Sequence, residues 1–204
     1  MQSAEVGIQL AKEKAIEQLK KIAHNIVASK AGVVFKDNRF EIPFFNQLYY
    51  VILPDFLITD EQGKNINPAH ELLVLNYLAN ADGTEITGEW QPFRYVKGGA
   101  CSNFSVKTVE PLVREYNIDA SSFHLAAKVF NALPLGFKDI SYCFYLLPKV
   151  PVAIILNLAT EEFPADVNLL FDSSVTHYLE SEDISVITEM FVGRLLKISK
   201  QIKS

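Results

Sequence analysis

The feature that most constrains the fold is a pair of apolar segments, residues 150–158 and 167–171, separated by a short acidic turn. Apolar runs of this length that are rich in β-branched residues and bounded by turn residues indicate buried strands. The turn between them holds Glu161, Glu162 and Asp166 beside a proline. Two buried strands joined by a charged loop predict a rigid frame that presents a site at one end.

The N-terminal part of the chain predicts an antiparallel meander followed by a helix. Asp37 and Asn38 predict a tight turn between the first two strands. Asn67 followed by Pro68 predicts a helix start, because Asn caps helix N-termini and Pro suits the first helical position. Strand-forming residues occupy 32–35, 40–42, 44–53 and 56–58.

Apolar residues recurring at steps of three and four predict the remaining helices. We expect residues 4–28 to form one amphipathic helix and the chain from Ser181 onward to form another. Pro111 predicts a kink or a restart within its helix. The other expected elements are helices at 102–116 and 119–132, a strand at 140–147 and a short helix from Ser173 to residue 179.

Together these elements predict an α+β fold, with mainly antiparallel sheets packed against about five to six helices. The N-terminal and C-terminal helices are the amphipathic ones. A length of 204 residues suits a single domain covering residues 1–204. If the chain forms two lobes, the glycine-containing segment 82–100 is the expected hinge.

Composition narrows the class of protein. The net charge of −5 argues against nucleic-acid and anionic-membrane partners, which need clustered Lys and Arg. Residues 1–28 mix lysines with glutamates, so no signal peptide is expected, and the longest apolar run is too short to span a bilayer. Two distant cysteines, Cys101 and Cys143, predict reduced thiols and a cytoplasmic protein.

The sequence contains no recognisable metal or nucleophile motif. The four histidines are isolated from one another and from the cysteines, so no metal site is predicted and no cofactor is indicated. Cys143 falls within an expected strand and predicts a small buried side chain. Cys101 follows two glycines near an expected helix start, where a thiol pKa is lowered. It is the better candidate for a reactive thiol, although an inert role is the commoner one for cysteine.

A second informative segment spans residues 87–99. It contains Trp90, Phe93 and Arg94, which are residue types suited to recognition, followed by Gly98 and Gly99. Paired glycines allow a ligand or another chain to approach the backbone closely. The structural alternative is a loop that is pinned by a buried Trp and Phe.

The acidic turn also has two interpretations. Glu161, Glu162, Asp166 and Asp172 can bind a ligand or a hard cation, or supply a general acid or base if one carboxyl is buried. They can equally be structural, through an ion pair with Arg94 or Lys97, or through Asp172 capping the helix that follows it.

These two segments resemble a family known as a domain of unknown function, found mainly in anaerobic microbes. The resemblance rests on Thr87–Arg94 with Gly98 and Gly99, and on a second segment formed by residues 148–151 and the Glu-Glu-Phe-Pro-Ala and Leu-Phe-Asp stretches at 161–165 and 170–172. It runs from about residue 15 to about residue 197. The resemblance implies that some relatives carry a cysteine-rich iron–sulfur domain, and it also implies a link of the family to corrinoid or one-carbon metabolism. Because this chain has two cysteines, any such cluster would belong to a partner.

Three hypotheses of function follow from the sequence. The first is a ligand-binding or accessory domain whose site combines the 87–99 segment with the acidic turn. The second is an enzyme that uses a carboxylate of the 161–172 segment as acid or base. The third is a protein-interaction module or homodimer that uses exposed aromatic residues.

Overall fold

The structure is a computed structural model that describes residues 2–99, 103–117, 119–137 and 140–203, with side chains from residue 6 onward. The described residues form six α-helices and two antiparallel sheets, of four and five strands, so the predicted α+β class is confirmed. The chain divides into two compact units. The first unit comprises Met1–Ile86, Leu147–Lys149 and His177–Leu179, and the second comprises Thr87–Leu146, Val150–Thr176 and Glu180–Ser204.

The four-stranded sheet belongs to the first unit and is a meander in the order β1-β2-β3-β4. Asp37 and Asn38 both have positive φ and form the predicted tight turn between its first two strands. The predicted strand 44–53 starts later than expected, because Phe45 and Asn46 also have positive φ and form a second turn. The strands are β1 (Val34–Lys36), β2 (Arg39–Phe44), β3 (Gln47–Ile52) and β4 (Leu57–Asp60).

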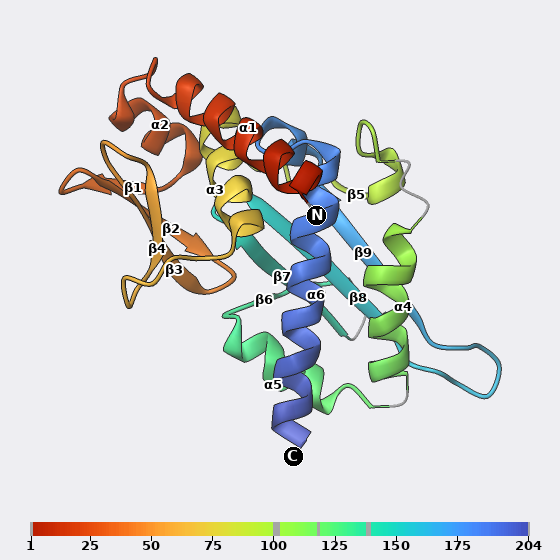
Figure 1. Cartoon of the computed structure of the whole chain (residues 1–204). Coiled ribbons are helices and arrows are strands. Elements are labelled where there is room, and N and C mark those ends of the chain that lie inside the picture. Colours follow the sequence, from red (N-terminus) through yellow and green to blue (C-terminus); the bar gives the residue numbers. More distant parts are fainter. Residues whose placement is uncertain (1, 100–102, 118, 138–139, 204) are drawn as a thin grey trace. The chain divides into compact units, whose positions relative to one another are not determined.

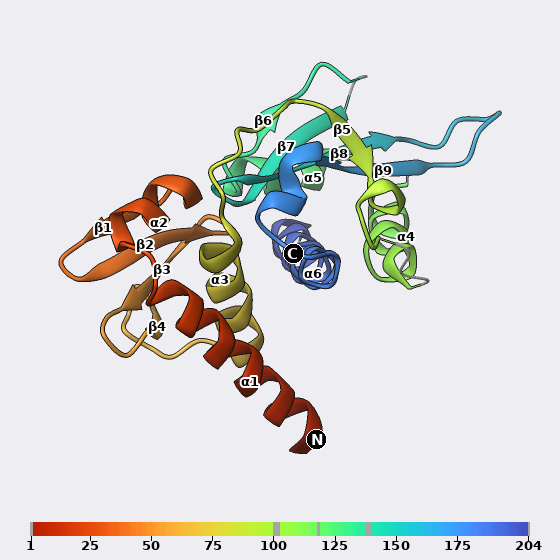
Figure 2. The same cartoon turned by 90° about the horizontal axis from the view of Figure 1, so that it is seen from above.

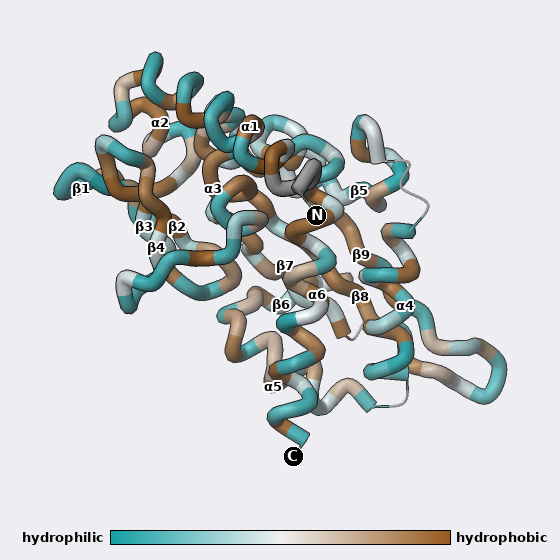
Figure 3. The backbone as a smooth tube through the Cα atoms, in the orientation of Figure 1, coloured by the Kyte–Doolittle hydropathy of each residue, from teal (hydrophilic) through white to brown (hydrophobic). Residues whose placement is uncertain are grey.

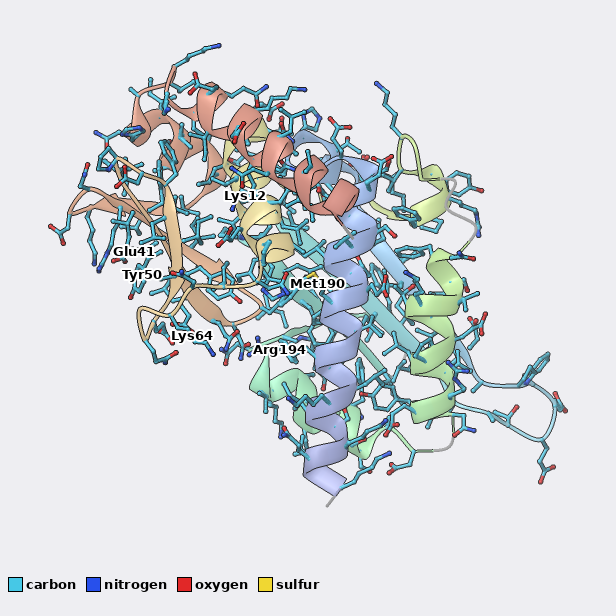
Figure 4. All side chains as sticks on the ribbon, in the orientation of Figure 1. Lys12, Glu41, Tyr50, Lys64, Met190 and Arg194 are labelled. Carbon is cyan, nitrogen blue, oxygen red and sulfur yellow. The ribbon has the colours of Figure 1, made fainter. Side chains whose placement is uncertain are left out.

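One exposed face of this sheet carries a small charged cluster. Glu41 of β2 lies opposite Tyr50 of β3 (Figure 4). The Glu41 carboxylate pairs with Arg39 at 3.0 Å and with Lys36 at 3.2 Å, and the Arg39 guanidinium lies 4.2 Å from the centre of the Tyr50 ring. These contacts support the cross-strand register.

The helices of the first unit are α1 (Gln2–Leu19), α2 (His24–Ala31) and α3 (Pro68–Asn80). The prediction of one helix over residues 4–28 is wrong, because the chain turns at residues 20–23 and Ala23 is extended. The turn rotates the buried face, so that Val27 is buried whereas Ile26 is exposed. α3 begins as predicted, with the Asn67 side chain accepting a hydrogen bond from the Ala69 N–H at 2.8 Å.

α1 packs along α3 (Figures 1 and 2). Lys12 of α1 forms an ion pair with Glu71 of α3 (Figure 4). Buried side chains beneath this contact include Ala15 and Leu19 of α1 and Leu75 of α3. Apolar side chains of the N-terminal helix are thus buried within its own unit, as its predicted amphipathic character requires.

The five-stranded sheet belongs to the second unit, apart from Leu147 at the end of β7, and has the order β5-β9-β8-β7-β6 (Figure 1). Its central strands coincide with the apolar runs and are coloured hydrophobic in Figure 3, so this part of the prediction is confirmed. The two edge strands, β5 and β6, were not predicted: the first was expected to be part of a loop, and the second to follow the end of a helix. The strands are β5 (Trp90–Pro92), β6 (Leu133–Pro134), β7 (Ile140–Leu147), β8 (Val150–Asn157) and β9 (Asp166–Asp172).

The helices of the second unit are α4 (Phe104–Tyr116), α5 (Ser121–Val129) and α6 (Ser181–Lys203). Aromatic side chains join them to the sheet. The ring centre of Phe191 in α6 lies 5.0 Å from that of Phe144 in β7. The ring centre of Phe104 in α4 lies 6.1 Å from that of Phe171 in β9. Pro111 lies inside α4 without dividing it. Two short 3-10 helices, η1 (Phe93–Tyr95) and η2 (Ser173–His177), complete the described elements.

Across the described ranges, we find no helix with both the length and the apolar character that a membrane span requires.

Candidate functional site

Asp172, the last residue of β9, anchors the start of the 87–99 segment. Its carboxylate accepts hydrogen bonds from the backbone N–H groups of Thr87 (3.1 Å) and Gly88 (2.7 Å) and from the Thr87 hydroxyl (3.0 Å). It also accepts from the backbone N–H (3.0 Å) and the hydroxyl (2.7 Å) of Ser174. The carboxylate lies opposite Trp90 in the β5–β9 pairing and is fully buried. The three bonds from Thr87 and Gly88 tie the segment that leads into β5 to the end of β9, and the two from Ser174 cap the chain after β9.

The same hydrogen bonds determine the protonation state of Asp172. Burial alone would raise the pKa of this carboxyl, but the hydrogen bonds from Ser174, Thr87 and Gly88 outweigh burial and lower the pKa below its ordinary value. Asp172 is therefore ionised at neutral pH, and its oxygens are already occupied. A general acid needs a raised pKa and access to the reactant, so this carboxylate fits the capping role rather than the catalytic one.

Steric contacts explain the two consecutive glycines. Gly98 has a φ of +82°, and a Cβ on it would lie 2.7 Å from the Ser181 hydroxyl oxygen. A Cβ on Gly99 would lie 2.0 Å from the carbonyl oxygen of Phe93. The Gly99 N–H donates to the Val96 carbonyl at 2.7 Å, which closes the loop after η1. The glycines thus let this loop return tightly against its own start.

A pocket of about 350 Å³ lies at one edge of the second unit, where η1, α4 and β9 are side by side (Figures 1 and 2). We call it the edge pocket. Its volume falls near the lower end of the range of about 300–1,000 Å³ that is usual for ligand sites. Its lining residues are Pro92, Phe93, Arg94, Gly99, Phe104, Ser105, Val109, Asp166, Val167, Asn168, Leu169 and Leu170.

The edge pocket carries both charge signs. Arg94 is exposed, and its guanidinium carbon lies 5.0 Å from the centre of the Tyr95 ring. Within the described ranges, Arg94 and Lys97 form no ion pair with a carboxylate, so the structural pairing considered for them is absent there. Asp166 is exposed and accepts a hydrogen bond from the Asn168 amide at 2.9 Å. Arg94 is therefore available to an anionic group of a ligand.

Glu161 and Glu162 lie elsewhere, in the turn that joins β8 and β9, and both are exposed. We call residues 160–164 the hairpin tip; it extends beyond the sheet (Figures 1 and 2), and its charged residues are hydrophilic in Figure 3. The Thr160 hydroxyl accepts from the Phe163 N–H at 3.1 Å, and the Phe163 carbonyl accepts from the Thr160 N–H at 2.9 Å. This tight turn presents a Phe163 side chain that is 68% exposed.

The structure brings some of the predicted site residues together and separates others. Phe93, Arg94, Gly99 and Asp166 line the edge pocket. Trp90 is half-buried in β5, Gly98 contacts Ser181, Asp172 is buried, and Glu161 and Glu162 project from the hairpin tip. Sequence reasoning missed the contribution of α4, since Ser105 and Val109 belong to an ordinary amphipathic helix with no local motif.

Cys143 and His177 have structural surroundings. Cys143 is buried, and burial together with the charge of Asp172 raises its pKa to about 11, as expected for an inert side chain. Cys101, the other candidate thiol, lies outside the described residues. No group of three or more His, Cys, Asp or Glu side chains suited to a metal ion occurs in the ranges that the structure describes. His177 instead pairs with Asp82 at 2.6 Å.

Comparison with family models assigns the chain to a family. A family model described as Domain of unknown function (DUF3786) matches residues 23–194, which include both motif segments and the edge pocket. The chain belongs to this family. The resemblance expected from the two segments is thereby confirmed at the level of a domain of unknown function. No curated protein and no solved structure matches the chain.

In this DUF3786 domain, the two segments are in direct contact with each other. Thr87 and Gly88 at the start of the first segment bind Asp172 at the end of the second, and β5 pairs with β9 through Trp90 and its neighbours. Further along the first segment, Gly99 allows η1 to be placed beside β9. The two segments therefore form one structural unit that ends in the edge pocket.

Proposed function

We propose that the second unit is a ligand-binding domain whose site is the edge pocket. The observation that carries the proposal is the lining of this pocket by Phe93, Arg94 and Gly99 of one motif segment and by Asp166 of the other. Phe93 and Phe104 supply a stacked aromatic wall, with ring centres 4.0 Å apart. A ligand with an anionic group for Arg94 and an apolar body for this wall fits the lining.

Fragment binding tests this function directly. Benzoate and phenyl phosphate, each at about 10 mM, are added to the ¹⁵N-labelled full chain, because fragments of about a dozen heavy atoms bind in the millimolar range. We expect backbone signals of η1, α4 and β9 to shift. Arg94→Gln should weaken this binding about tenfold or more, since the bond that it removes is charge-assisted. Lys97→Gln, an exposed cation of the same loop that does not line the pocket, is the matched control.

The proposal is wrong if neither these fragments nor any other probe shifts signals of the pocket residues. Native mass spectrometry of protein purified under anaerobic conditions complements the fragments, because it retains a bound molecule of unknown identity. A small molecule that co-purifies with the parent protein and is lost from Arg94→Gln but retained by Lys97→Gln would support the pocket as its site.

A second function is favoured by the hairpin tip. We propose that the tip is a protein-interaction surface, because Phe163 is 68% exposed and borders an apolar hollow of about 430 Å³. Ile140, Leu156 and Pro164 are among the residues that line this hollow. Light scattering across a concentration series tests the homodimer form of this proposal. A concentration-dependent mass that Phe163→Ser abolishes would support it, and a monomer mass throughout would refute it.

The wider context of these functions comes from the resemblance alone. We propose a cytoplasmic location and a link to the iron–sulfur or corrinoid chemistry of anaerobic microbes, with any cluster held by a partner. The two cysteines of this chain are fewer than the four thiolates that such a cluster uses. Co-purification of an iron-containing partner from an anaerobic source would support this link, and a partner-free protein with full binding activity would argue against it.

A further inference from the structure

β9 is paired along nearly the whole of one edge but along only part of the other. β8 pairs with β9 from Asp166 to Phe171. On the opposite edge, β5 pairs with Leu170, Phe171 and Asp172 alone. None of the described strands pairs with residues 166–169 on that edge, and this is where the edge pocket lies.

β5 ends where the chain turns into η1. Pro92 is still extended, with φ −70° and ψ 155°, but the next residue begins η1, and the Phe93 carbonyl accepts a hydrogen bond from the Val96 N–H at 3.0 Å. This turn carries the chain away from β9. Because Gly99 has no side chain, the returning loop closes against the Phe93 carbonyl and keeps η1 in place.

The strand register shows which backbone groups face the unpaired edge. The Ser173 N–H donates to the Glu89 carbonyl at 2.8 Å, at the end of the β5–β9 pairing. In an antiparallel pair, every second residue directs its N–H and C=O toward the same neighbour. Counting back from Ser173 through Phe171, the residues that do so are Leu169 and Val167. Both line the edge pocket.

Unpaired N–H and C=O groups along a strand edge are a template for another strand. We propose that this edge of β9 binds an extended peptide segment of a partner protein as an added strand, in line with β5 and with a carboxylate of the segment at Arg94. This inference rests on the proposed ligand-binding function of the same pocket and names the class of ligand.

The lining of the pocket suits a peptide in this position. Side chains at every second position of the added strand would lie over Phe104 and Val109 of α4, which supply an apolar wall. Arg94 is the second residue after the end of β5 and lines the pocket, so its guanidinium is placed to receive a carboxylate at the end of the segment that lies beside β5. On a segment that runs parallel to β9, that group is the terminal carboxylate of the peptide. On a segment that runs antiparallel to β9, as β5 does, it is the carboxylate of an acidic residue near the N-terminus.

Peptide selection provides the probes. A library of random heptapeptides with free C-termini is selected against the full-length protein, and selected peptides are synthesised as free acids and as amides. We expect bound peptides to shift the backbone amide signals of Val167 and Leu169. We also expect N-methylation of the peptide backbone to weaken binding about tenfold at alternate positions and to have little effect between them, because only alternate N–H groups face β9.

The carboxylate is tested on the same peptides. A C-terminal source predicts that the amide binds about tenfold more weakly than the acid, whereas a side-chain source predicts that loss for Glu→Gln or Asp→Asn changes in the peptide. Arg94→Gln in the protein should abolish either difference, and Lys97→Gln should preserve it. If neither carboxylate contributes, the assignment of Arg94 is wrong.

The outcomes separate this inference from the function on which it rests. Peptides that leave Val167 and Leu169 unshifted, or that show no alternating effect of N-methylation, overturn the added strand. Failure to select any peptide while benzoate or phenyl phosphate binds the pocket overturns it too, yet leaves the ligand-binding function standing. Failure of every probe to reach the pocket overturns both.

Discussion

Replacing Asp172 by Asn tests the structural anchor on which the candidate site depends. One oxygen of the carboxylate accepts the bonds from Thr87 and Ser174, and the other accepts from the Gly88 N–H at 2.7 Å. The substituted amide would keep one oxygen but would direct an NH₂ group at the Gly88 N–H. Facing that part-buried N–H with a second donor costs about 1 kcal/mol, and the four remaining bonds lose their charge assistance, which is about 0.5 kcal/mol for each.

We therefore expect Asp172→Asn to lower the free energy of unfolding by about 3 kcal/mol at neutral pH. Trp90, the only tryptophan, lies opposite Asp172 in the β5–β9 pairing, so its fluorescence in a urea titration reports on this region. Asp166→Asn is the matched control, because this exposed carboxylate has one hydrogen bond from Asn168. Its effect should be about 0.5 kcal/mol or less.

The pH dependence gives an independent readout of the same anchor. Folding lowers the pKa of Asp172, so its ionised form stabilises the folded protein above the unfolded-state pKa of about 3.9. This contribution is lost as the pH falls below that value toward the folded-state pKa. Asp172→Asn should remove this part of the acid dependence. An Asp172→Asn variant as stable as the parent protein at neutral pH, with an unchanged acid dependence, would refute the reasoning.

Three further predictions concern other parts of the molecule. Gly99→Ala should lower the free energy of unfolding by about 2 kcal/mol, because its methyl carbon would meet a backbone carbonyl oxygen of η1, whereas Gly136→Ala, which meets nothing within 4 Å, should change it little. A Cβ at Gly193 inside α6 would also meet nothing within 4 Å, so Gly193→Ala should raise the free energy of unfolding by about 0.5–1 kcal/mol. An unchanged or lower melting temperature would contradict this. In an NMR titration Asp82 should show a pKa of about 2, since its hydrogen bonds, that from His177 above all, outweigh the effect of burial. His177→Ala should return this pKa toward its ordinary value, and a titration unchanged by that substitution would count against the pairing.

Local sequence signals were sufficient to predict an element wherever the residues at that position strongly favour one backbone conformation. Asn67 before Pro68 correctly predicts the start of α3, and the apolar run from residue 150 correctly predicts β8. The break between α1 and α2 was missed because residues 20–23 contain neither Gly nor Pro. There the backbone turns so that Val27, rather than Ile26, is buried, which is a requirement of packing and not of local propensity.

For the candidate site, too, the sequence predicted some features and not others. The sequence singled out the two segments that meet, because they hold an Arg, a Gly pair and a set of carboxylates in expected loops, where binding residues are often found. It left the surroundings of their carboxylates open. Asp172 is buried among five donors, while Glu161 and Glu162 project from the hairpin tip, and only the exposure of each carboxylate separates these environments.

What the sequence by itself determined is the α+β class, the buried strands β7, β8 and β9, and the pair of segments on which the family resemblance rests. These follow from hydrophobic periodicity and turn chemistry, which act over a few residues. Tertiary structure alone decided that β5 stops at Pro92 and leaves part of the β9 edge unpaired beside α4. An unpaired strand edge depends on where the neighbouring strand ends in space, and strand pairing between residues about 80 apart leaves no mark in either local sequence.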